Sequence, residues 1–402
     1  MKMIKRIQLV ALGCVCVSLA SGSVWAAQSK QVVGTQTLKE ELAKLDNMQQ
    51  AYQSELAKMR QLREQYAAQL KKMNEAKPAQ STLSDSKYNK LKEQLDRIQI
   101  SGFVRAKYDS DDRDGIGSGS NNKHFYMNLE GKMKVSDDWD AHFQSETRKG
   151  YTVNQSWRNG DPGSDDQNGT FQRIWVEGKP ANIGIALGTK WWGLGFQNVP
   201  FGHAADGISV DYDVVPSWNV KAYWLRPRQG DLVTMPNGQE TTITGMNITG
   251  NITKNLAASI TYAGNKDYNG DQKMSQMGAF ELQYQATDDI LLRGAFVRTN
   301  ADDYNTSQEY RVDYKGSKLE QVGSYGMYVR YIDFERYGDY SHDDEWGSLP
   351  NDAKGWLLGG TFVPFKNVVW ETFFSVQRRN RASSVDHNAM RHLLRTQIDF
   401  HF

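Results

Sequence analysis

The chain has 402 residues, with 48 Lys+Arg against 47 Asp+Glu, 39% apolar residues and 24% charged residues. This balance of charge gives no reason to expect a nucleic-acid partner. Beyond residue 27 there is no run of about 18 apolar residues, which excludes a helical membrane protein. Both cysteines, Cys14 and Cys16, lie in the first 20 residues. A chain without that segment has no disulfide, no thiolate nucleophile and no cysteine-ligated metal.

Residues 1–27 have the organisation of a secretory signal peptide. Positive charges precede an apolar stretch at residues 7–19, and small residues follow it. The stretch is too short to span a bilayer, so we expect export and cleavage after Ala26 or Ala27. A lipoprotein, acylated at Cys14, is the alternative, but the apolar region before that cysteine is short for a lipoprotein signal.

Residues 35–76 have the pattern of a periplasmic coiled coil. Residues 35–97 contain no Gly and no Trp, and apolar or aromatic side chains recur at alternating steps of four and three. So narrow a stripe needs a partner helix, and self-association is expected; the alternative is an isolated charged helix that acts as a spacer. The seam consists of Leu38, Leu42, Leu45, Tyr52, Leu56, Met59, Tyr66, Leu70 and Met73, with polar Gln49 and Arg63 available to fix the register.

Residues 77–97 are predicted to be a linker with a short amphipathic helix. Pro78 interrupts the first helix. The apolar face of the second piece contains Tyr88, Leu91, Leu95 and Ile98.

Residues 98–402 are predicted to form a transmembrane antiparallel β-barrel. Apolar and polar residues alternate with period two over segments of about ten residues. Short and long connections take turns along the chain, which is the pattern of an up-and-down meander that closes on itself. Our count is about 16 strands, and an even count returns the last strand to the side of the first.

The last residues of the chain resemble the terminal strand that outer-membrane assembly machinery recognises. Ile398, Phe400 and Phe402 alternate with polar residues up to the aromatic end of the chain. We therefore predict an assembly signal in this strand and a location in the outer membrane, with outer-membrane lipid as surroundings.

Four motifs give the chain a family resemblance. Tyr314-Lys315-Gly316 is followed by GSYGMYV at 323–329, AKGWLLGG at 353–360 and VPFKNV at 363–368. With the signal, the coiled coil and the terminal strand, these motifs are similar to those of the porins of diderm Firmicutes (Negativicutes). The resemblance covers about residues 98–402 and implies a trimeric outer-membrane porin. Many relatives carry a surface-layer homology domain that binds the cell wall; it is missing here, which puts contact of this chain with the wall in doubt.

The inner face of such a barrel is predicted to line an aqueous channel, because about 16 strands enclose more space than side chains fill. Strand parity gives a small excess of inward basic residues, so a mild anion preference is one interpretation; paired wall charges without selectivity are the other. Pore-lining residues by this parity include Arg105, Lys107, Glu130, Lys132, Glu146, Arg148, Arg173, Glu177, Lys190 and Arg395.

Residues 191–206 are predicted to form a long apolar loop. In general porins the third long loop folds into the lumen, so this one is expected to narrow the pore; a loop that caps the barrel or contacts a neighbouring subunit is the alternative. The residues concerned are Trp191, Trp192, Phe196, His203 and Asp206.

Other loops are acidic and are predicted to be solvated. They contain Asp109, Asp111, Asp112 and Asp114; Asp161, Asp165 and Asp166; and Asp339, Asp343, Asp344 and Glu345. A calcium site in the first group fits poorly, because Arg113 interrupts the ligand spacing. With no catalytic motif, metal motif or cofactor motif in the sequence, we expect neither an enzyme nor a cofactor. The competing hypothesis to a porin is a structural tether, in which the coiled coil is the working part and the barrel an anchor.

Overall fold

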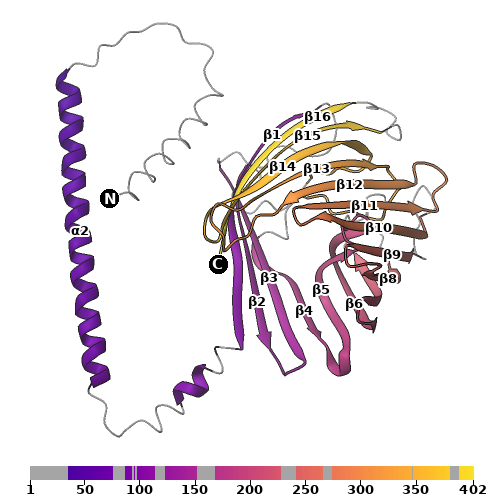
Figure 1. Ribbon diagram of the computed structural model, residues 1–402, viewed down its shortest axis with the longest axis horizontal. Coiled ribbons are helices and arrows are strands. Elements are labelled where there is room, and N and C mark those ends of the chain that lie inside the picture. Colours follow the sequence, from indigo (N-terminus) through magenta and orange to yellow (C-terminus); the bar gives the residue numbers. More distant parts are fainter. Residues whose placement is uncertain are drawn as a thin grey trace. The chain divides into compact units, whose positions relative to one another are not determined.

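The computed structural model describes residues 35–75, 87–92, 95, 97–113, 123–151, 168–227, 241–265, 274–345, 347–380 and 389–402. Within them the chain forms one long helix and a closed antiparallel sheet of 16 strands (Figure 1). Helix and sheet belong to two separate compact units that divide after Lys87. The predicted signal peptide, and Asp114, Asp161, Asp165 and Asp166, lie outside the described residues. No described helix is both long and apolar enough to cross a membrane.

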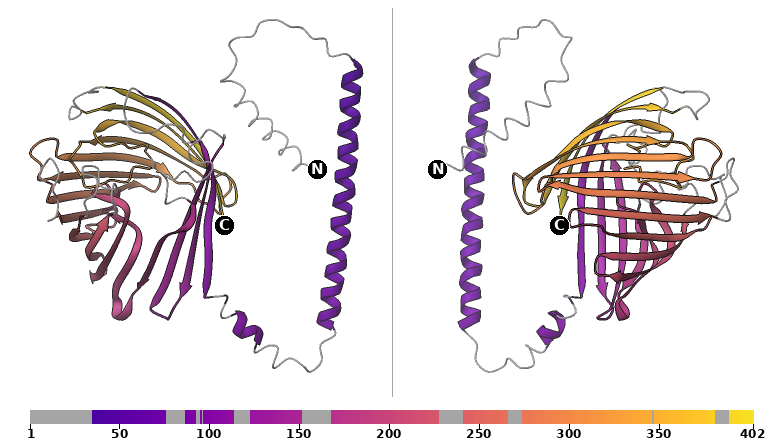
Figure 2. Two further views of the ribbon diagram at one scale, coloured as in Figure 1. Left: turned by 180° about the vertical axis from the view of Figure 1, so that it is seen from behind. Right: turned by 45° about the vertical axis from the view of Figure 1, so that its right-hand side comes forward.

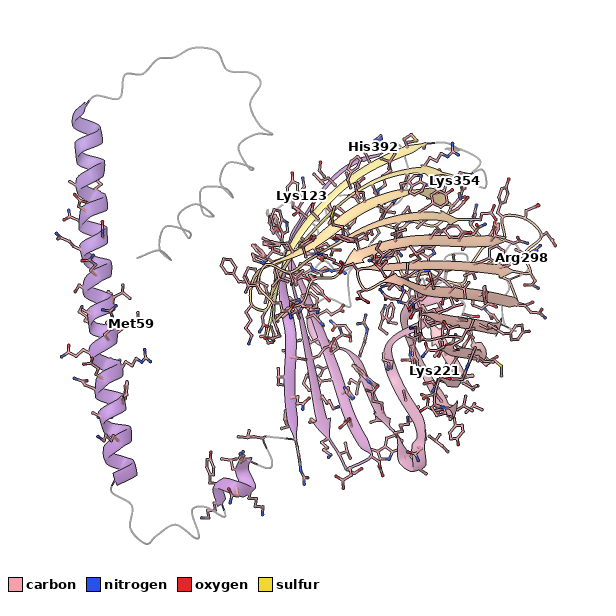
Figure 3. All side chains as sticks on the ribbon, viewed as in Figure 1. Met59, Lys123, Lys221, Arg298, Lys354 and His392 are labelled. Atoms are coloured by element: carbon pink, nitrogen blue, oxygen red, sulfur yellow. The ribbon has the colours of Figure 1, made fainter. Side chains whose placement is uncertain are left out.

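The long helix, α2 (Thr35–Glu75), agrees with the predicted helical range to within one residue. Its sequence is rich in Leu, Ala, Glu, Gln and Lys, which favour helices, and contains neither Gly nor Pro. Of the predicted seam, Leu56, Met59 and Tyr66 have exposed side chains, and Figure 3 shows Met59 projecting from the helix. The other seam side chains lie outside the described set. The association of α2 with further helices stays a prediction.

The strands follow one another around the sheet in chain order, as the predicted meander requires. A 3₁₀ turn, η2 (Pro180–Asn182), separates two of them. The strands are β1 (Ile98–Arg113), β2 (His124–Lys134), β3 (Trp139–Gly150), β4 (Asn168–Gly178), β5 (Ile183–Leu194), β6 (Phe201–Val215), β7 (Trp218–Pro227), β8 (Ile243–Asn251), β9 (Leu256–Asn265), β10 (Gln276–Thr287), β11 (Ile290–Thr299), β12 (Thr306–Lys315), β13 (Tyr325–Phe334), β14 (Ala353–Phe365), β15 (Val368–Arg379) and β16 (Met390–His401).

The connections alternate between the two ends of the barrel. Turns such as residues 216–217 and 366–367 define a turn end, and connections such as residues 195–200 and 335–352 define a loop end. The right-hand view of Figure 2 shows β2–β4 (purple) crossing steeply behind β9–β14, as expected when tilted strands close a barrel. The predicted fold class is confirmed.

β1 closes the barrel by pairing with β16, with Val104 opposite Phe400. Gly102 and Phe402 exchange backbone hydrogen bonds of 3.2 and 3.1 Å at this seam. A Cβ on Gly102 would lie 2.1 Å from the carbonyl oxygen of Asn128 and 3.0 Å from the Phe402 ring. Glycine is therefore the residue that fits here without a shift of the backbone.

The two faces of the sheet differ in chemistry. Large apolar side chains alternate along the strands with polar ones, and the apolar set is exposed, as Ile398, Phe400 and Phe402 illustrate. The polar set faces the barrel interior, where it forms ion pairs and contacts two loops. An exposed apolar surface around a closed sheet is costly in water and suited to lipid.

Candidate functional site

All ten predicted pore-lining residues occupy the inner face, at positions that alternate with the exposed apolar residues. The parity of their strands was therefore assigned correctly, while a role in permeation is a separate question. Seven have partly exposed side chains, and three are buried. The partly exposed ones are Arg105, Glu130, Lys132, Arg148, Arg173, Glu177 and Lys190; the buried ones are Lys107, Glu146 and Arg395.

The inner wall of β2–β5 carries a polar network. Arg173 lies 3.2 Å from the Glu146 carboxylate. Lys190 lies 3.3 Å from Glu177, and its ammonium stands 5.7 Å from the ring centroid of Trp175. Arg173 and Lys190 thus each have a partner of opposite sign, which holds these long side chains along the wall instead of across the lumen.

A ladder of Arg–carboxylate pairs follows the seam where β1 meets β16. Asp109 and Asp111, predicted to be solvated loop charges, belong to β1 and turn their carboxylates inward; that prediction was wrong for both. β1 extends to Arg113, and each carboxylate meets an arginine of β16 in a bidentate pair that offsets the cost of burial. Arg395 pairs with Asp109 at 2.8 Å, and Arg391 pairs with Asp111 at 3.1 Å. A third pair has the opposite arrangement, with Arg105 of β1 and Asp399 of β16 at 2.6 Å. In each pair the two N–O distances are equal.

The loop predicted over residues 191–206 is much shorter in the structure. β5 and β6 extend into it from both sides and leave only residues 195–200 as the connection. Of the five predicted constriction residues, only Phe196 lies in a loop. The others stand in the strands, Trp192 and His203 on the inner face, Trp191 and Asp206 on the outer face. The apolar residues that suggested a folded-in loop include wall residues that face a core inside the barrel.

The short loop at residues 195–200 does turn into the lumen. The carboxylate of Glu281, on β10, accepts hydrogen bonds from the backbone N–H groups of Phe196 and Gln197, the second at 3.3 Å. Gly195 has a φ of +81°, and a Cβ there would lie 1.9 Å from the Glu281 carboxylate. Glycine is thus required both by the backbone and by the approach of this carboxylate.

A second loop, residues 335–352 between β13 and β14, also folds into the barrel. Its acidic residues were predicted to be solvated, and for Asp339 that prediction was wrong, since its side chain is buried at 2% exposure. The buried ring of His342 reaches Asp339 through Nδ1 at 3.1 Å and the carbonyl oxygen of Leu349 through Nε2 at 2.8 Å. Neighbouring aromatic residues such as Tyr337 and Tyr340, rather than the acidic ones, were the signal for burial.

This second loop is held against the inner wall of β12–β16. The guanidinium of Arg330 bridges two carboxylates, Glu309 of β12 at 2.7 Å and Glu345 of the loop. Side-chain donors of the wall also reach loop carbonyl oxygens, namely Arg395 to Glu345 at 2.6 Å, Arg391 to Gly347 at 2.7 Å and Gln377 to Ser348 at 2.7 Å.

The two loops meet inside the barrel. Phe201, at the start of β6, forms a parallel β-bridge with Ser341. The N–H of Gly202 donates to the Ser341 carbonyl oxygen at 2.7 Å, and the N–H of Asp343 donates to the Asn198 carbonyl oxygen at 3.2 Å. Main-chain hydrogen bonds thus join segments that are more than 100 residues apart in the chain.

Both loops rest on an apolar core inside the loop end of the barrel. Leu225, Ile243 and Val297, all on inner positions, are fully buried there. The loops contribute Val199 and Leu349. Parity predicted a polar inner face throughout, so this core was missed. Charged and amide side chains line other parts of the inner face, on β2–β4 and along the seam of β1 and β16.

Burial and neighbouring charges shift the pKa values of titratable groups in the second loop. Burial raises the pKa of the Asp343 carboxyl to about 6, and it does the same for Asp352. Burial lowers the pKa of His342, but the carboxylate of Asp339 outweighs this, so that its pKa lies above the ordinary value. Burial raises the pKa of Glu345, while the Arg330 guanidinium brings it below the usual range.

A cavity of about 530 Å³ opens on the inner face at the turn end. Carboxylates and amines both line it, among them Glu177, Asp211, Lys190 and Lys221. Its volume lies in the range of sites for small molecules, and its charged lining suits hydrated polar solutes.

Comparisons with known proteins find likeness only in structure. No protein-family model and no curated protein matches the chain. A triple mutant of the Rh. blastica porin superimposes with a TM-score of 0.47 at 12% identity, covering 76% of this chain and 100% of that chain. A second triple mutant of that porin gives 0.48 at 12% identity with the same coverage, and a double mutant gives 0.47 at 11%. The likeness to these bacterial porins is one of fold.

Proposed function

We propose that the chain is an outer-membrane porin through which small hydrophilic solutes and ions diffuse passively. The observation that carries the proposal is the division of faces in a closed 16-strand sheet, apolar and exposed outside, charged and hydrogen-bonded inside. Lipid accepts the first face, and water accepts the second. A signal peptide and motifs similar to those of porins of diderm Firmicutes support export and the same role.

The path for solutes runs, in this proposal, between the polar wall of β2–β5 and the two loops. Phe196, Trp192 and His203 stay candidates for the constriction, joined by residues 335–352. Trp191 and Asp206 are not, because their side chains lie on the outer face.

Any anion preference is expected to be small. Many basic residues of the inner wall that produced the predicted excess are ion-paired, among them Arg105, Lys132 and Arg395. A paired charge presents a weaker field to a passing ion than a bare one. The reversal potential in a salt gradient measures this directly, and we expect a permeability ratio near one.

Cysteine accessibility tests the water-filled lumen. The mature chain is expected to contain no cysteine, so Lys132→Cys and Met133→Cys each introduce a single thiol on neighbouring positions of β2, one inside and one outside. A charged thiol reagent added to channels in a planar bilayer should reduce the conductance of the Lys132→Cys variant and leave the matched Met133→Cys variant unchanged. Block of neither, with both thiols reactive after unfolding, contradicts the proposal.

One observation favours the tether as a second candidate function. The two loops and the apolar core fill part of the lumen at the loop end. Single-channel recording separates the candidates, because stepwise openings support the porin, whereas a correctly folded barrel without conductance supports an anchor for the coiled coil.

We further propose that α2 forms a periplasmic trimeric coiled coil, since its exposed stripe needs partner helices. Chemical cross-linking of the full mature chain should then give trimers. Outer-membrane lipid surrounds the barrel in this proposal, and the assembly machinery handles β16 through Ile398, Phe400 and Phe402. Contact of the coiled coil with the cell wall would be seen as co-sedimentation with purified peptidoglycan.

A further inference from the structure

Basic side chains gather on the outer face of the barrel near its loop end. Among the described outer-face strand residues of this zone, the acidic ones are Asp112, opposite His392 in the register, Asp206, beside Arg226, and Asp333, beside Lys354. Figure 3 shows Arg298 and Lys354 near the loop ends of their strands. The basic residues of the zone are Lys123, Lys149, Arg226, Arg298, Lys354 and Arg378.

Two of these cations form a local patch. Lys354 on β14 and Arg378 on β15 are register partners, so their Cβ atoms are about 5 Å apart. The Lys354 ammonium is 3.9 Å from the Asp333 carboxylate, a loose contact that leaves room for another anion. The Arg378 side chain is exposed. The next partners toward the turn end, Trp356 and Val376, are apolar.

An apolar groove of about 450 Å³ begins directly beside this patch. Its rim includes Tyr331 and Trp356, whose ring centroids are 4.9 Å apart. Gly294 on β11 stands opposite Tyr310 and contributes no side chain, which widens the groove on that side. The groove is lined by Leu292, Tyr310, Val312, Val329, Tyr331 and Trp356, together with atoms of Arg293 and Arg311.

We propose that this patch and groove bind a phosphorylated glycolipid of the outer leaflet. The phosphate would lie between Lys354 and Arg378, and an acyl chain would lie along Tyr331 and Trp356. This inference rests on the membrane location in the proposed function, with the long loops on the outer side and the short turns on the periplasmic side, as in bacterial outer-membrane barrels. Lipid contacts the whole outer face, so the groove alone discriminates little between lipids. The two cations discriminate phosphorylated lipids from uncharged ones. Each cation contributes about fivefold in affinity, which is about 1 kcal/mol.

The test compares two double variants of the full mature chain in neutral detergent. Lys354→Gln with Arg378→Gln removes the patch; Lys149→Gln with Arg226→Gln removes the same charge from other strands of the zone. Native mass spectrometry with purified phosphorylated lipid A as the probe should show a 10- to 25-fold loss of binding for the first variant and less than a twofold loss for the second. Dephosphorylated lipid A should bind the unaltered chain as weakly as phosphorylated lipid A binds the first variant.

Three outcomes overturn the inference. Equal losses in both variants would show a diffuse electrostatic zone without a local site. Equal binding of phosphatidylglycerol would remove the glycolipid from the proposal, and displacement of lipid A by millimolar inorganic phosphate would show a site for small anions. Both variants should conduct as the unaltered chain does, since the substituted side chains point outward. A silent but lipid-binding chain would contradict the porin and leave this site standing.

Discussion

Arg330 makes the anchorage of the second loop open to a direct test. Its guanidinium is almost fully buried and joins Glu309 of the wall to Glu345 of the loop. Arg330→Met keeps most of the side-chain volume and removes both ion pairs. We expect the residues 335–352 to leave the wall far more often in this variant, and the barrel itself to lose stability.

The two contacts of Arg330 predict separate magnitudes. Glu309 is 1% exposed, and a buried carboxylate that loses its ion-pair partner costs about 3–5 kcal/mol. That loss concerns the barrel wall. The contact with Glu345 concerns the loop, and a hydrogen bond between charged groups contributes about 1.5–3 kcal/mol. Its removal should raise the population of the displaced loop about 10- to 150-fold.

Single-channel recording measures how often the loop is displaced, and thermal unfolding measures the stability of the barrel wall. We expect frequent transitions to a second conductance level in the Arg330→Met channel and a lower midpoint of unfolding. Arg311→Met is the matched control, because Arg311 is the register partner of Arg330 on β12, pairs with Asp313 at 2.7 Å and acts on Glu345 of the loop only through the longer-range effect of its charge.

A double variant separates the effect of Arg330 on the stability of the barrel wall from its effect on the position of the loop. Glu309→Leu added to Arg330→Met removes the unpaired carboxylate, so the unfolding midpoint should recover. The conductance transitions should persist, since Glu345 still lacks its ion pair with Arg330. Identical recordings from Arg330→Met and Arg311→Met would refute the reasoning, as would transitions that vanish together with the unfolding defect.

Three further expectations follow from other contacts. The raised pKa of Asp343, about 6 against an ordinary 3.8, means that its carboxyl stabilises the inward loop fully below pH 3.8 and that this contribution is lost as the pH rises through 6. Conductance transitions should therefore be rarer at pH 5 than at pH 7.5, and Asp343→Asn should reduce this dependence, to which the raised pKa of Asp352 contributes with the same sign. Gly102→Val should prevent closure of β1 on β16 and abolish the folded band in unheated gels, whereas Gly278→Val, with open space around it, should fold. Leu56→Asp should reduce cross-linked trimers several-fold, and Gln53→Asp, off the seam, should not.

The barrel could be predicted from the sequence because its signals are local. In β2, Phe125 and Met127 are exposed outside while Tyr126 and Asn128 are buried inside, and such alternation is visible without knowledge of any partner. Strand order followed from the alternating lengths of the connections. Both signals come from residues that are close in the sequence, so they can be recognised without knowledge of the tertiary structure.

The contents of the lumen depend on contacts between distant segments and were missed for that reason. Asp109 was interpreted as a loop charge because its partner, Arg395, is 286 residues away. Asp339 was interpreted as solvated because its acceptor role for Ser307 and His342 is not visible from its acidic neighbours. From the sequence alone, a carboxylate is interpreted as solvated until its hydrogen-bond donor in the folded protein is known.

One signal for the covered wall was nevertheless local. A strand buried on one face alternates, whereas a strand covered on both faces is apolar at successive positions. Residues 223–225, 295–297 and 356–358 are such runs, in β7, β11 and β14, and their inner members are buried against the core within the barrel. Residues 142–148, in β3, keep a polar side chain at each inner position. An unbroken run alone does not separate the walls, since residues 174–176 of β4 and 185–187 of β5 form such runs within the polar wall of β2–β5. The strict polar alternation of β3 identifies a wall that faces water, which is where permeation should be sought first.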